Sequence, residues 1–209
     1  MLFLRRRFMT WCSALAVVVG ASGTAFAQQA PDELVKRVSN EVLEAARADK
    51  SIQAGDVNKV MALVETKVMP HVNFQRMTSS AVGRYWRQAT PEQQKRLQDE
   101  FKVLLVRTYS GALAQVRDQT VQLKPLRAAA GDAEVLVRTE IRGKGDPIQL
   151  DYRLEKAADT WKIYDVNVMG IWLVENYRNT FAQEISAGGI DGLIAKLAER
   201  NKAAAGTKS

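Results

Sequence analysis

The sequence predicts an α+β fold, in which helices from both ends of the chain pack on one face of a curved antiparallel sheet. Apolar residues recur with the helical period of 3.6 from Pro31 to about Val116. The period then changes to 2 between Val121 and Val168, and helical spacing returns after Gly170. A block of helices, a block of strands and a second block of helices are typical of an α+β domain.

Residues 1–27 lie outside this pattern and have the composition of a cleaved export signal. Residues 5–7 are three arginines, residues 12–20 form a short apolar run, and Ala25–Ala27 has the small-x-small pattern that signal peptidase recognises. The apolar run is shorter than the roughly 20 residues of a membrane-spanning helix. We therefore expect cleavage after Ala27 and a periplasmic location, by the Sec route or, given the arginines, the twin-arginine route.

The mature chain has the size of one domain with its own core. Cleavage leaves 182 of the 209 residues and lowers the net charge from +7 to +4, because three arginines are removed. Cys12 is the only cysteine and leaves with the signal, so no disulfide can form. We expect residues 28–200 to form a single domain, residues 201–209 a flexible polar tail, and the protein to be a monomer.

The mature chain begins with predicted helices. Pro31 suits a first helical position, and acidic residues follow it in the first turn. The apolar stripe of this helix is Leu34, Val35, Val38, Val42 and Ala46. Asp56 is a plausible N-cap for a second helix, which Pro70 ends or kinks. A further short helix is predicted over residues 74–85.

The strongest local helix signal is Thr90-Pro91-Glu92-Gln93. Threonine can cap the helix, proline occupies its first position, and Gln93 can complete a capping box. The helix that follows should run to about Val116. Its apolar face comprises Leu97, Phe101, Leu104, Leu105, Thr108 and Ala112.

Four segments with a period of 2 predict strands joined by short turns, which indicates a four-stranded antiparallel meander. They are Val121–Lys124, Val135–Arg142, Ile148–Glu155 and Trp161–Val168. Only one face of this sheet is apolar, so only one face needs to be covered. The apolar face comprises Val135, Val137, Ile141, Ile148, Leu150, Tyr152 and Leu154.

Two helices are predicted to close the chain. The first carries the stripe Val174, Tyr177, Phe181 and Ile185 and should end at Gly188-Gly189. The second carries Ile190, Leu193, Ile194 and Leu197.

Few residues suit catalysis or metal binding. His71 is the only histidine and follows Pro70 at a helix end, where a surface or capping role is commoner than that of a general base. One histidine and no mature cysteine make a zinc site unexpected. Residues 143–145 (Gly-Lys-Gly) suit a hairpin turn, and basic residues interleaved with acids do not suit nucleic acid. We expect no catalytic residue, metal or cofactor.

Carboxylates on strands leave one enzymatic alternative. Asp151 shares its strand face with Arg153, which predicts exposure to solvent. Asp165 has the parity of Ile163 and would face the interior. In a cone-shaped α+β fold such a carboxylate can act as a general base. Hydrogen bonding of Asp165 to neighbouring backbone is the alternative that we favour.

Several segments together resemble the MlaC (toluene-tolerance) family, and they occur in the same order across the whole mature chain. The segments are Val68–Phe74, Gly83–Gln93, Phe101, Leu104-Leu105, Thr108-Tyr109, Trp161–Val166, Gly170-Ile171, Asn176–Arg178, Phe181 and Gly189–Leu193. The resemblance implies that the helices and the curved sheet enclose an apolar lipid cavity. It also implies a periplasmic phospholipid carrier whose cargo is a diacyl phospholipid.

The implied partners are an outer-membrane lipoprotein complex and an inner-membrane transporter complex of the ABC type, between which such a carrier maintains outer-membrane lipid asymmetry. Two residues depart from the family pattern. Asn73 replaces the usual aspartate and removes any salt bridge there; Trp172 replaces a small residue and would narrow or reshape the cavity mouth. A carrier of another lipid, such as a hopanoid, and a lipid-independent adaptor that joins two complexes remain alternatives.

The lipid should lie between the apolar face of the sheet and the stripes of the long helix and of the helix after Gly170. The headgroup should stay in water at the mouth, because burying an unpaired phosphate is costly. The predicted lipid-binding residues are Leu104, Leu105, Val137, Ile141, Ile148, Leu150, Tyr152, Val166, Val174, Tyr177 and Phe181.

Overall fold

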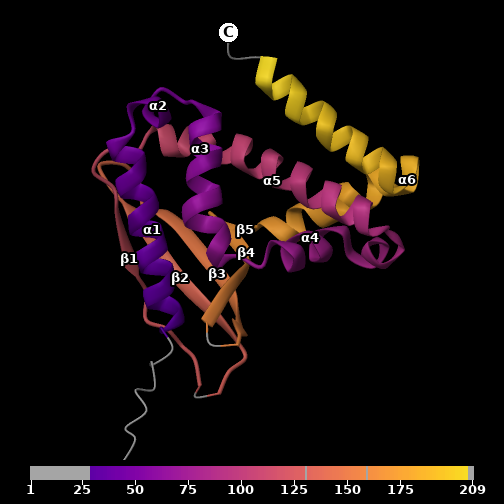
Figure 1. Ribbon diagram of the computed structural model, residues 1–209. Helices are drawn as coiled ribbons and strands as arrows, with labels where there is room; N and C mark the ends of the chain where they lie inside the picture. Colours follow the sequence, from indigo (N-terminus) through magenta and orange to yellow (C-terminus); the bar gives the residue numbers. More distant parts are fainter. Residues whose placement is uncertain (1–28, 130, 159, 207–209) are drawn as a thin grey trace, which may run out of the picture.

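A computed structural model describes residues 29–206 except for residues 130 and 159 (Figure 1). The predicted export signal and its cleavage site lie outside the described residues. The α-helices are α1 (Pro31–Ala48), α2 (Lys50–Gln53), α3 (Val57–Leu63), α4 (Phe74–Val82), α5 (Pro91–Ala114) and α6 (Leu173–Gly206). A π-helix (Val64–Val68) and a 3-10 turn (Met69–His71) continue α3, and a 3-10 helix (Gly83–Gln88) follows α4. The strands are β1 (Thr120–Leu123), β2 (Glu134–Arg142), β3 (Ile148–Ala157), β4 (Thr160–Val168) and β5 (Ile171–Trp172).

The predicted helix boundaries rest on caps that the structure contains. The Asp56 carboxylate accepts from the backbone N–H of Asn58 at 2.9 Å at the start of α3. Thr90 and Gln93 form the predicted capping box, with each side chain accepting from the other residue's backbone N–H. Gly189 has φ 68°, which glycine adopts readily, and divides α6 into two helical segments at the predicted place.

The second segment of α6 reaches Gly206, beyond the predicted end of the domain at residue 200. Asn201 is buried, and its amide donates to the Glu100 carbonyl oxygen at 3.0 Å and to the Glu100 carboxylate at 2.7 Å. This contact with α5 orders residues whose composition alone suggests a tail. Residues 207–209 lie outside the described part of the chain.

The sheet is an antiparallel meander with the order β1-β2-β3-β4-β5. The four predicted strands are confirmed, and β5 is a short addition that alternation cannot reveal in two residues. It follows a tight turn in which Met169 and Gly170 both have positive φ, 51° and 91°. The Asn167 side chain accepts from the Gly170 N–H at 2.8 Å and holds this turn.

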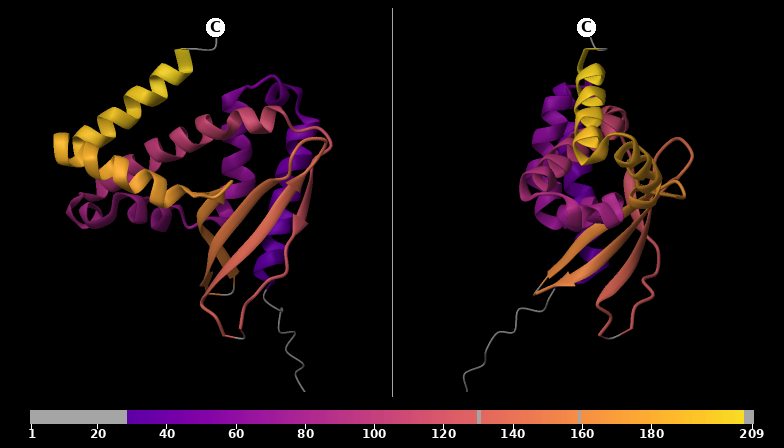
Figure 2. Two further views of the ribbon diagram at one scale, coloured as in Figure 1. Left: turned by 180° about the vertical axis from the view of Figure 1, so that it is seen from behind. Right: turned by 90° about the vertical axis from the view of Figure 1, so that its right-hand side faces the viewer.

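The helices cover one face of the sheet. In Figure 1, α1 and α3 stand in front of the strands, whereas α4, α5 and α6 extend to one side. Seen from behind, the strands face the viewer and none of the described helices crosses them (Figure 2, left). We call the covered side the apolar face and the other side the polar face.

A β-bulge in β4 changes which side chains share a face. Arg153 pairs with Asp165, but Leu154 pairs with Ile163, so Tyr164 is the extra residue. Directly paired residues project to the same side of a sheet, which places Ile163 on the apolar face and Asp165 on the polar face. The prediction that Asp165 shares a face with Ile163 is therefore wrong. Simple alternation along β4 does not include the extra residue at the bulge.

The interior consists of three hydrophobic clusters. The first joins α4, α5 and α6 around Met77, Ala81, Val82, Leu97, Phe101, Val174, Phe181, Ile185, Leu193, Ile194 and Leu197. The second joins α1 to the sheet through Leu34, Val35, Val38, Val135, Val137, Leu154, Trp161 and Ile163. The third joins α1, α2, α3 and α5 through Leu43, Ala46, Ile52, Val60, Leu63, Val106 and Val116. Small domains usually have one contiguous core. Apolar side chains that belong to none of the three clusters are therefore candidates for contact with a ligand.

Candidate lipid-binding site

The apolar face of the sheet is tightly packed at one end. Val135, Leu154 and Ile163 form a cross-strand row there, and each is at most 8% exposed. Helix α1 covers this row with the apolar stripe predicted from the sequence. We call this row the closed end.

Along β3 and β4, exposure of the apolar side chains increases away from the closed end. The next row is Val137, Tyr152 and Val166, in which Val137 is buried while Tyr152 and Val166 are partly exposed. Both side chains lie on the margin of the second cluster, and Val166 also touches the first. This row therefore marks the boundary between packed and unpacked parts of the face.

Beyond that row is the open end of the apolar face, which belongs to none of the three clusters of described residues. Its side chains are partly exposed or, at the tip, largely exposed: Ile148 at 39% and Ile171 at 56%. The cross-strand pairs Ile141–Ile148, Leu150–Val168 and Val168–Ile171 place all of them on one side of the sheet. The open end comprises Ile141, Ile148, Leu150, Val168 and Ile171.

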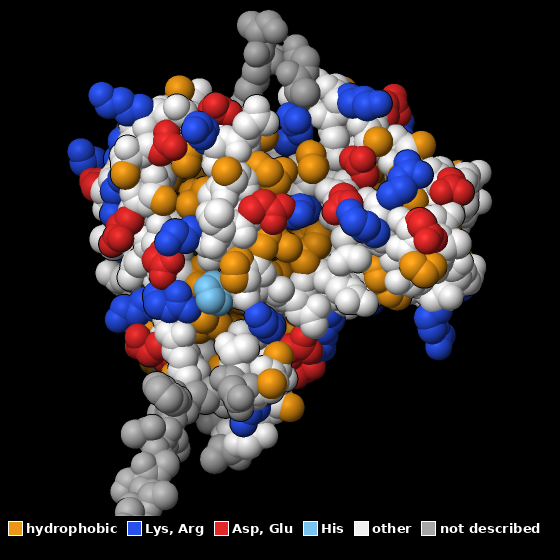
Figure 3. All heavy atoms as spheres, viewed as in Figure 1, with side chains coloured by type: hydrophobic (Ala, Val, Ile, Leu, Met, Phe, Trp, Pro, Cys, Tyr) orange, Lys and Arg blue, Asp and Glu red, His pale blue; other side chains and the backbone are white. Residues whose placement is uncertain are grey.

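Helix α5 carries further apolar side chains that are only partly buried. Phe101 packs in the first cluster and Val106 in the third, so the helix connects the two. Leu104 and Leu105 lie between these positions and are only partly buried. Figure 3 shows apolar side chains gathered in the middle of this side of the molecule, between α3 and the region of α4 and α5.

We call Leu104 and Leu105 of α5, together with Tyr177 of α6, the α5–α6 wall. A group of aromatic rings packs within and behind this wall. The Phe101 ring lies 5.0 Å from that of Tyr177 and 5.2 Å from that of Phe181, both in edge-to-face geometry. Burial raises the pKa of the Tyr177 hydroxyl, and a hydrogen bond with Thr108 partly opposes that shift. Tyr177 thus places a neutral hydroxyl in a largely apolar wall.

The predicted lipid-binding residues fall into two groups. Val137, Val174 and Phe181 are buried in packed clusters. The others keep some exposure and lie on the open end, the boundary row or the α5–α6 wall: Leu104, Leu105, Ile141, Ile148, Leu150, Tyr152, Val166 and Tyr177. Which of them contact lipid remains a prediction. Val168 and Ile171 also belong to this surface; their parity was concealed by the bulge and by the shortness of β5.

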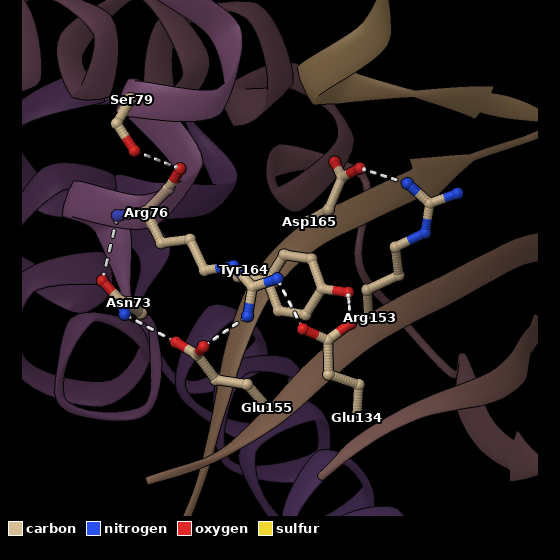
Figure 4. A network of polar contacts seen from close by, with 8 residues as sticks. All are labelled: Asn73, Arg76, Ser79, Glu134, Arg153, Glu155, Tyr164 and Asp165. Atoms are coloured by element: carbon tan, nitrogen blue, oxygen red, sulfur yellow. Dashed lines mark hydrogen bonds and ion pairs between the residues drawn. The ribbon is translucent and has the colours of Figure 1, made fainter. Parts of the chain in front are cut away.

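The polar face is organised around Arg76 of α4 (Figure 4). Its guanidinium pairs with Glu155 and, at 2.6 Å, with Glu134, which lie directly opposite each other on β3 and β2. It also stacks 3.6 Å from the ring centre of Tyr164, whose hydroxyl donates to Glu134 at 2.8 Å. The hydrogen bond from Arg76 is the main cause of the lowered pKa of Glu134. One cation thus offsets repulsion between two cross-strand carboxylates.

Asn73 completes this network as an amide. Its side-chain oxygen accepts from the backbone N–H of Arg76 at 3.0 Å and caps α4. Its side-chain nitrogen donates to the Glu155 carboxylate at 2.6 Å. An aspartate at this position would bring a second carboxylate against Glu155. The departure from the family pattern is therefore compatible with this particular network.

Asp165 ties β4 to the start of α6. One carboxylate oxygen accepts from the backbone N–H of Val166 at 2.9 Å and of Val174 at 3.1 Å, and the other accepts from Arg153 at 3.1 Å. Burial raises the pKa of Asp165, and these partners oppose the shift. The favoured prediction of backbone hydrogen bonding is confirmed. The enzymatic alternative needs this carboxylate on the apolar face, from which it points away.

Asp151 and Trp172 differ from the sequence predictions. Asp151 is 7% exposed, so the expectation that it faces solvent is wrong. It pairs across the strands with Asn167, and Asn167 pairs with Trp172, so all three lie on the polar face. The Trp172 ring stacks 3.9 Å from the Arg153 guanidinium. The added strand β5 thus covers the polar face with Trp172, which does not narrow the apolar face.

Other features of the described residues do not coincide with this surface. His71 ends a short 3-10 turn, and burial lowers its pKa. No three His, Cys, Asp or Glu side chains gather as a metal site within residues 29–206 as described. A groove of about 560 Å³ between the α2–α3 corner, α5 and the end of α6 is lined by Ser51, Asp56, Asn58 and Arg107, among others, and by none of the predicted lipid-binding residues.

Comparison with known proteins identifies the family. The model of the MlaC protein family matches residues 36–199. The chain belongs to the MlaC family. No helix of the part described is long and apolar enough to cross a membrane.

Two curated proteins resemble the chain over nearly its whole length, and the name of one concerns phospholipid. The chain is 25% identical over 194 residues to the intermembrane phospholipid transport system binding protein MlaC of Haemophilus influenzae, covering 90% of this chain and 91% of that protein. It is 28% identical over 208 residues to the toluene tolerance protein ttg2D of Pseudomonas putida, covering 96% and 94% respectively.

A solved structure shares both the sequence and the fold. It is the phospholipid-binding protein of Ralstonia solanacearum in complex with a phospholipid, at 49% identity and a TM-score of 0.81. The match covers 83% of this chain and 98% of that one.

Proposed function

We propose that this protein is a periplasmic carrier of diacyl phospholipid, with the acyl chains held between the apolar face of the sheet and the α5–α6 wall. The observation that carries the proposal is the open end of the apolar face. Leu150 and Val168 lie on the helix-covered face of the sheet yet remain partly exposed and outside the packed clusters. A folded protein normally fills such a position, so a bound apolar ligand is the natural complement.

The phospholipid-bound relative at 49% identity supports lipid as this ligand. The headgroup would remain in water near the tip residues Ile148 and Ile171, since burial of an unpaired phosphate is costly. Transfer of an intact lipid makes and breaks no covalent bond, so it requires no catalytic residue. Asp165 is committed to backbone and to Arg153, in agreement with a carrier.

Energetics constrain such a carrier. Moving two acyl chains of about 16 carbons each out of water is favourable by roughly 25 kcal/mol, at about 0.8 kcal/mol per methylene. A bilayer offers nearly the same gain, so loading and release are close to neutral only if the protein surface is equally dry. Aliphatic residues such as Leu104, Leu150 and Val166 meet this requirement.

The finer role rests on the family. We propose export by the predicted signal peptide and exchange of phospholipid between an outer-membrane lipoprotein complex and an inner-membrane ABC-type transporter complex, which would maintain outer-membrane lipid asymmetry. The name of the Haemophilus influenzae relative, an intermembrane phospholipid transport protein, supports this role.

The direct test is to purify the mature protein without added lipid, extract it with organic solvent and identify the extract by mass spectrometry. We expect about one diacyl phospholipid per protein. A hopanoid or another lipid in its place would replace phospholipid as the cargo. A lipid-free protein with a filled interior would refute the carrier and support the adaptor.

A further inference from the structure

Tyr152 occupies the position where the packed and the unpacked parts of the apolar face meet. On one side along β3 is Leu154, which is fully buried at the closed end; on the other is Leu150, which is partly exposed at the open end. Across the strands, Tyr152 pairs with buried Val137 and with partly exposed Val166. Tyr152 is thus the one large side chain of the boundary row.

The hydroxyl end of the Tyr152 side chain lies near residues of two other elements. Ser39 on α1 and Thr139 on β2 are close enough to lower the pKa of the hydroxyl, against the desolvation that raises it. Thr139 is itself buried and donates to the Leu150 carbonyl oxygen at 2.8 Å, which anchors it in the sheet. Desolvation raises the pKa of Tyr152, so the hydroxyl stays neutral at physiological pH.

We infer that Tyr152 forms the inner end wall of the lipid site and thereby limits the length of the acyl chains that the protein accepts. This inference rests on the proposed function. A chain that enters along Ile148 and Leu150 meets the Tyr152 ring before it reaches the row that α1 covers. Beyond the ring, Val135, Leu154 and Ile163 leave no unpacked surface for further methylenes.

The inference predicts shifts of opposite sign for smaller and larger side chains. Tyr152→Ala removes the ring and lengthens the site, so longer acyl chains become buried. In wild type these extra methylenes would stay in water. Compared with wild type, each additional methylene that the longer site buries should therefore raise the affinity for the longer lipid about fourfold. Tyr152→Trp extends the wall toward Leu150 and should favour shorter chains. Tyr152→Phe keeps the ring and should retain the wild-type length limit.

The experiment equilibrates each protein with vesicles made from an equimolar mixture of diacyl phosphatidylglycerols that differ only in chain length. The bound lipids are then quantified by mass spectrometry, with circular dichroism as the check of folding. Tyr164→Ala is the matched control: it truncates a tyrosine on the same sheet that projects to the polar face against Arg76. It should bind the wild-type distribution of chain lengths.

Unchanged distributions in both Tyr152→Ala and Tyr152→Trp would overturn the inference, as would an equal shift in Tyr164→Ala. If Tyr152→Ala does not fold, Tyr152→Leu and Tyr152→Trp still provide the two signs. A wild-type protein that binds no lipid refutes the proposed function instead, so the two failures are distinguishable.

Discussion

The two faces of the sheet are built on opposite rules. On the polar face, Arg76 joins Glu134 to Glu155, and Arg153 pairs with Asp165, whose carboxylate accepts a hydrogen bond from the start of α6. The principal charges there have partners within the chain. On the apolar face, α1 covers the closed end, whereas Leu150 and Val168 at the open end are left without packing in the three clusters. The comparison teaches that ion pairs within the chain join the charged side chains named here, whereas part of the apolar surface is left for another molecule.

The comparison is tested most severely by placing a charge on the open end. Leu150→Asp should reduce bound lipid from about one per protein to nearly none, because a carboxylate against acyl chains is not compensated. Lipid is measured by extraction and mass spectrometry, and folding by circular dichroism. Leu136→Asp is the matched control, since Leu136 is partly exposed on the polar face and pairs with Arg153. Full lipid content in a folded Leu150→Asp protein would mean that the chains lie elsewhere.

The next largest effect is expected on the polar face and on stability. Arg76→Ala leaves Glu134 and Glu155 opposed without their shared cation and should lower the free energy of unfolding by about 1–2 kcal/mol. That corresponds to a decrease in Tm of roughly 3–6 °C for a chain of this size. Lipid content of the folded fraction should stay unchanged. Arg76→Lys, which keeps the charge but not the fork, should fall between wild type and Arg76→Ala.

Substitution of Trp172 tests whether this residue affects the polar face alone. Trp172→Ala removes the ring that stacks on Arg153 and should cost about 0.5–1 kcal/mol, the usual worth of an exposed cation–π contact. Because the ring lies on the polar face, the amount and chain length of bound lipid should not change. Altered lipid binding with intact folding would show that Trp172 contributes to the lipid site after all. Urea unfolding and mass spectrometry supply the two measurements.

The smallest effect is a pH dependence on the polar face. The pKa of Glu134 is lower in the folded protein than its ordinary value near 4.3, so between the two values the unfolded chain binds more protons. Stability from this group is present above about pH 4.3 and is lost as pH falls through the folded pKa. Glu134→Gln should therefore be less stable than wild type at neutral pH by a few tenths of a kcal/mol, and the difference should vanish in acid. A difference that is constant with pH would exclude this linkage.

The sequence by itself predicted the local structure well, because caps and periodicity act over a few residues. The Thr90–Gln93 capping box, the Asp56 cap and the break at Gly189 are all determined by neighbours along the chain. The change of period from 3.6 to 2 and back predicted the α+β fold, and the family resemblance added the expectation of lipid. The apolar face of the meander followed from a simple period of 2.

The tertiary structure decided what each apolar stripe packs against. Phe181 and Leu104 belong to apolar stripes of the same kind, yet Phe181 is core and Leu104 is partly exposed, since this depends on which helix lies opposite. The bulge at Tyr164 moved Asp165 to the polar face and Val166 to the apolar face, and alternation along one strand cannot contain that information. The open end of the apolar face likewise lies outside the three packed clusters, which only the complete fold determines. Local sequence sets the side chains of an element, but the distance and direction of its partners come from the complete fold.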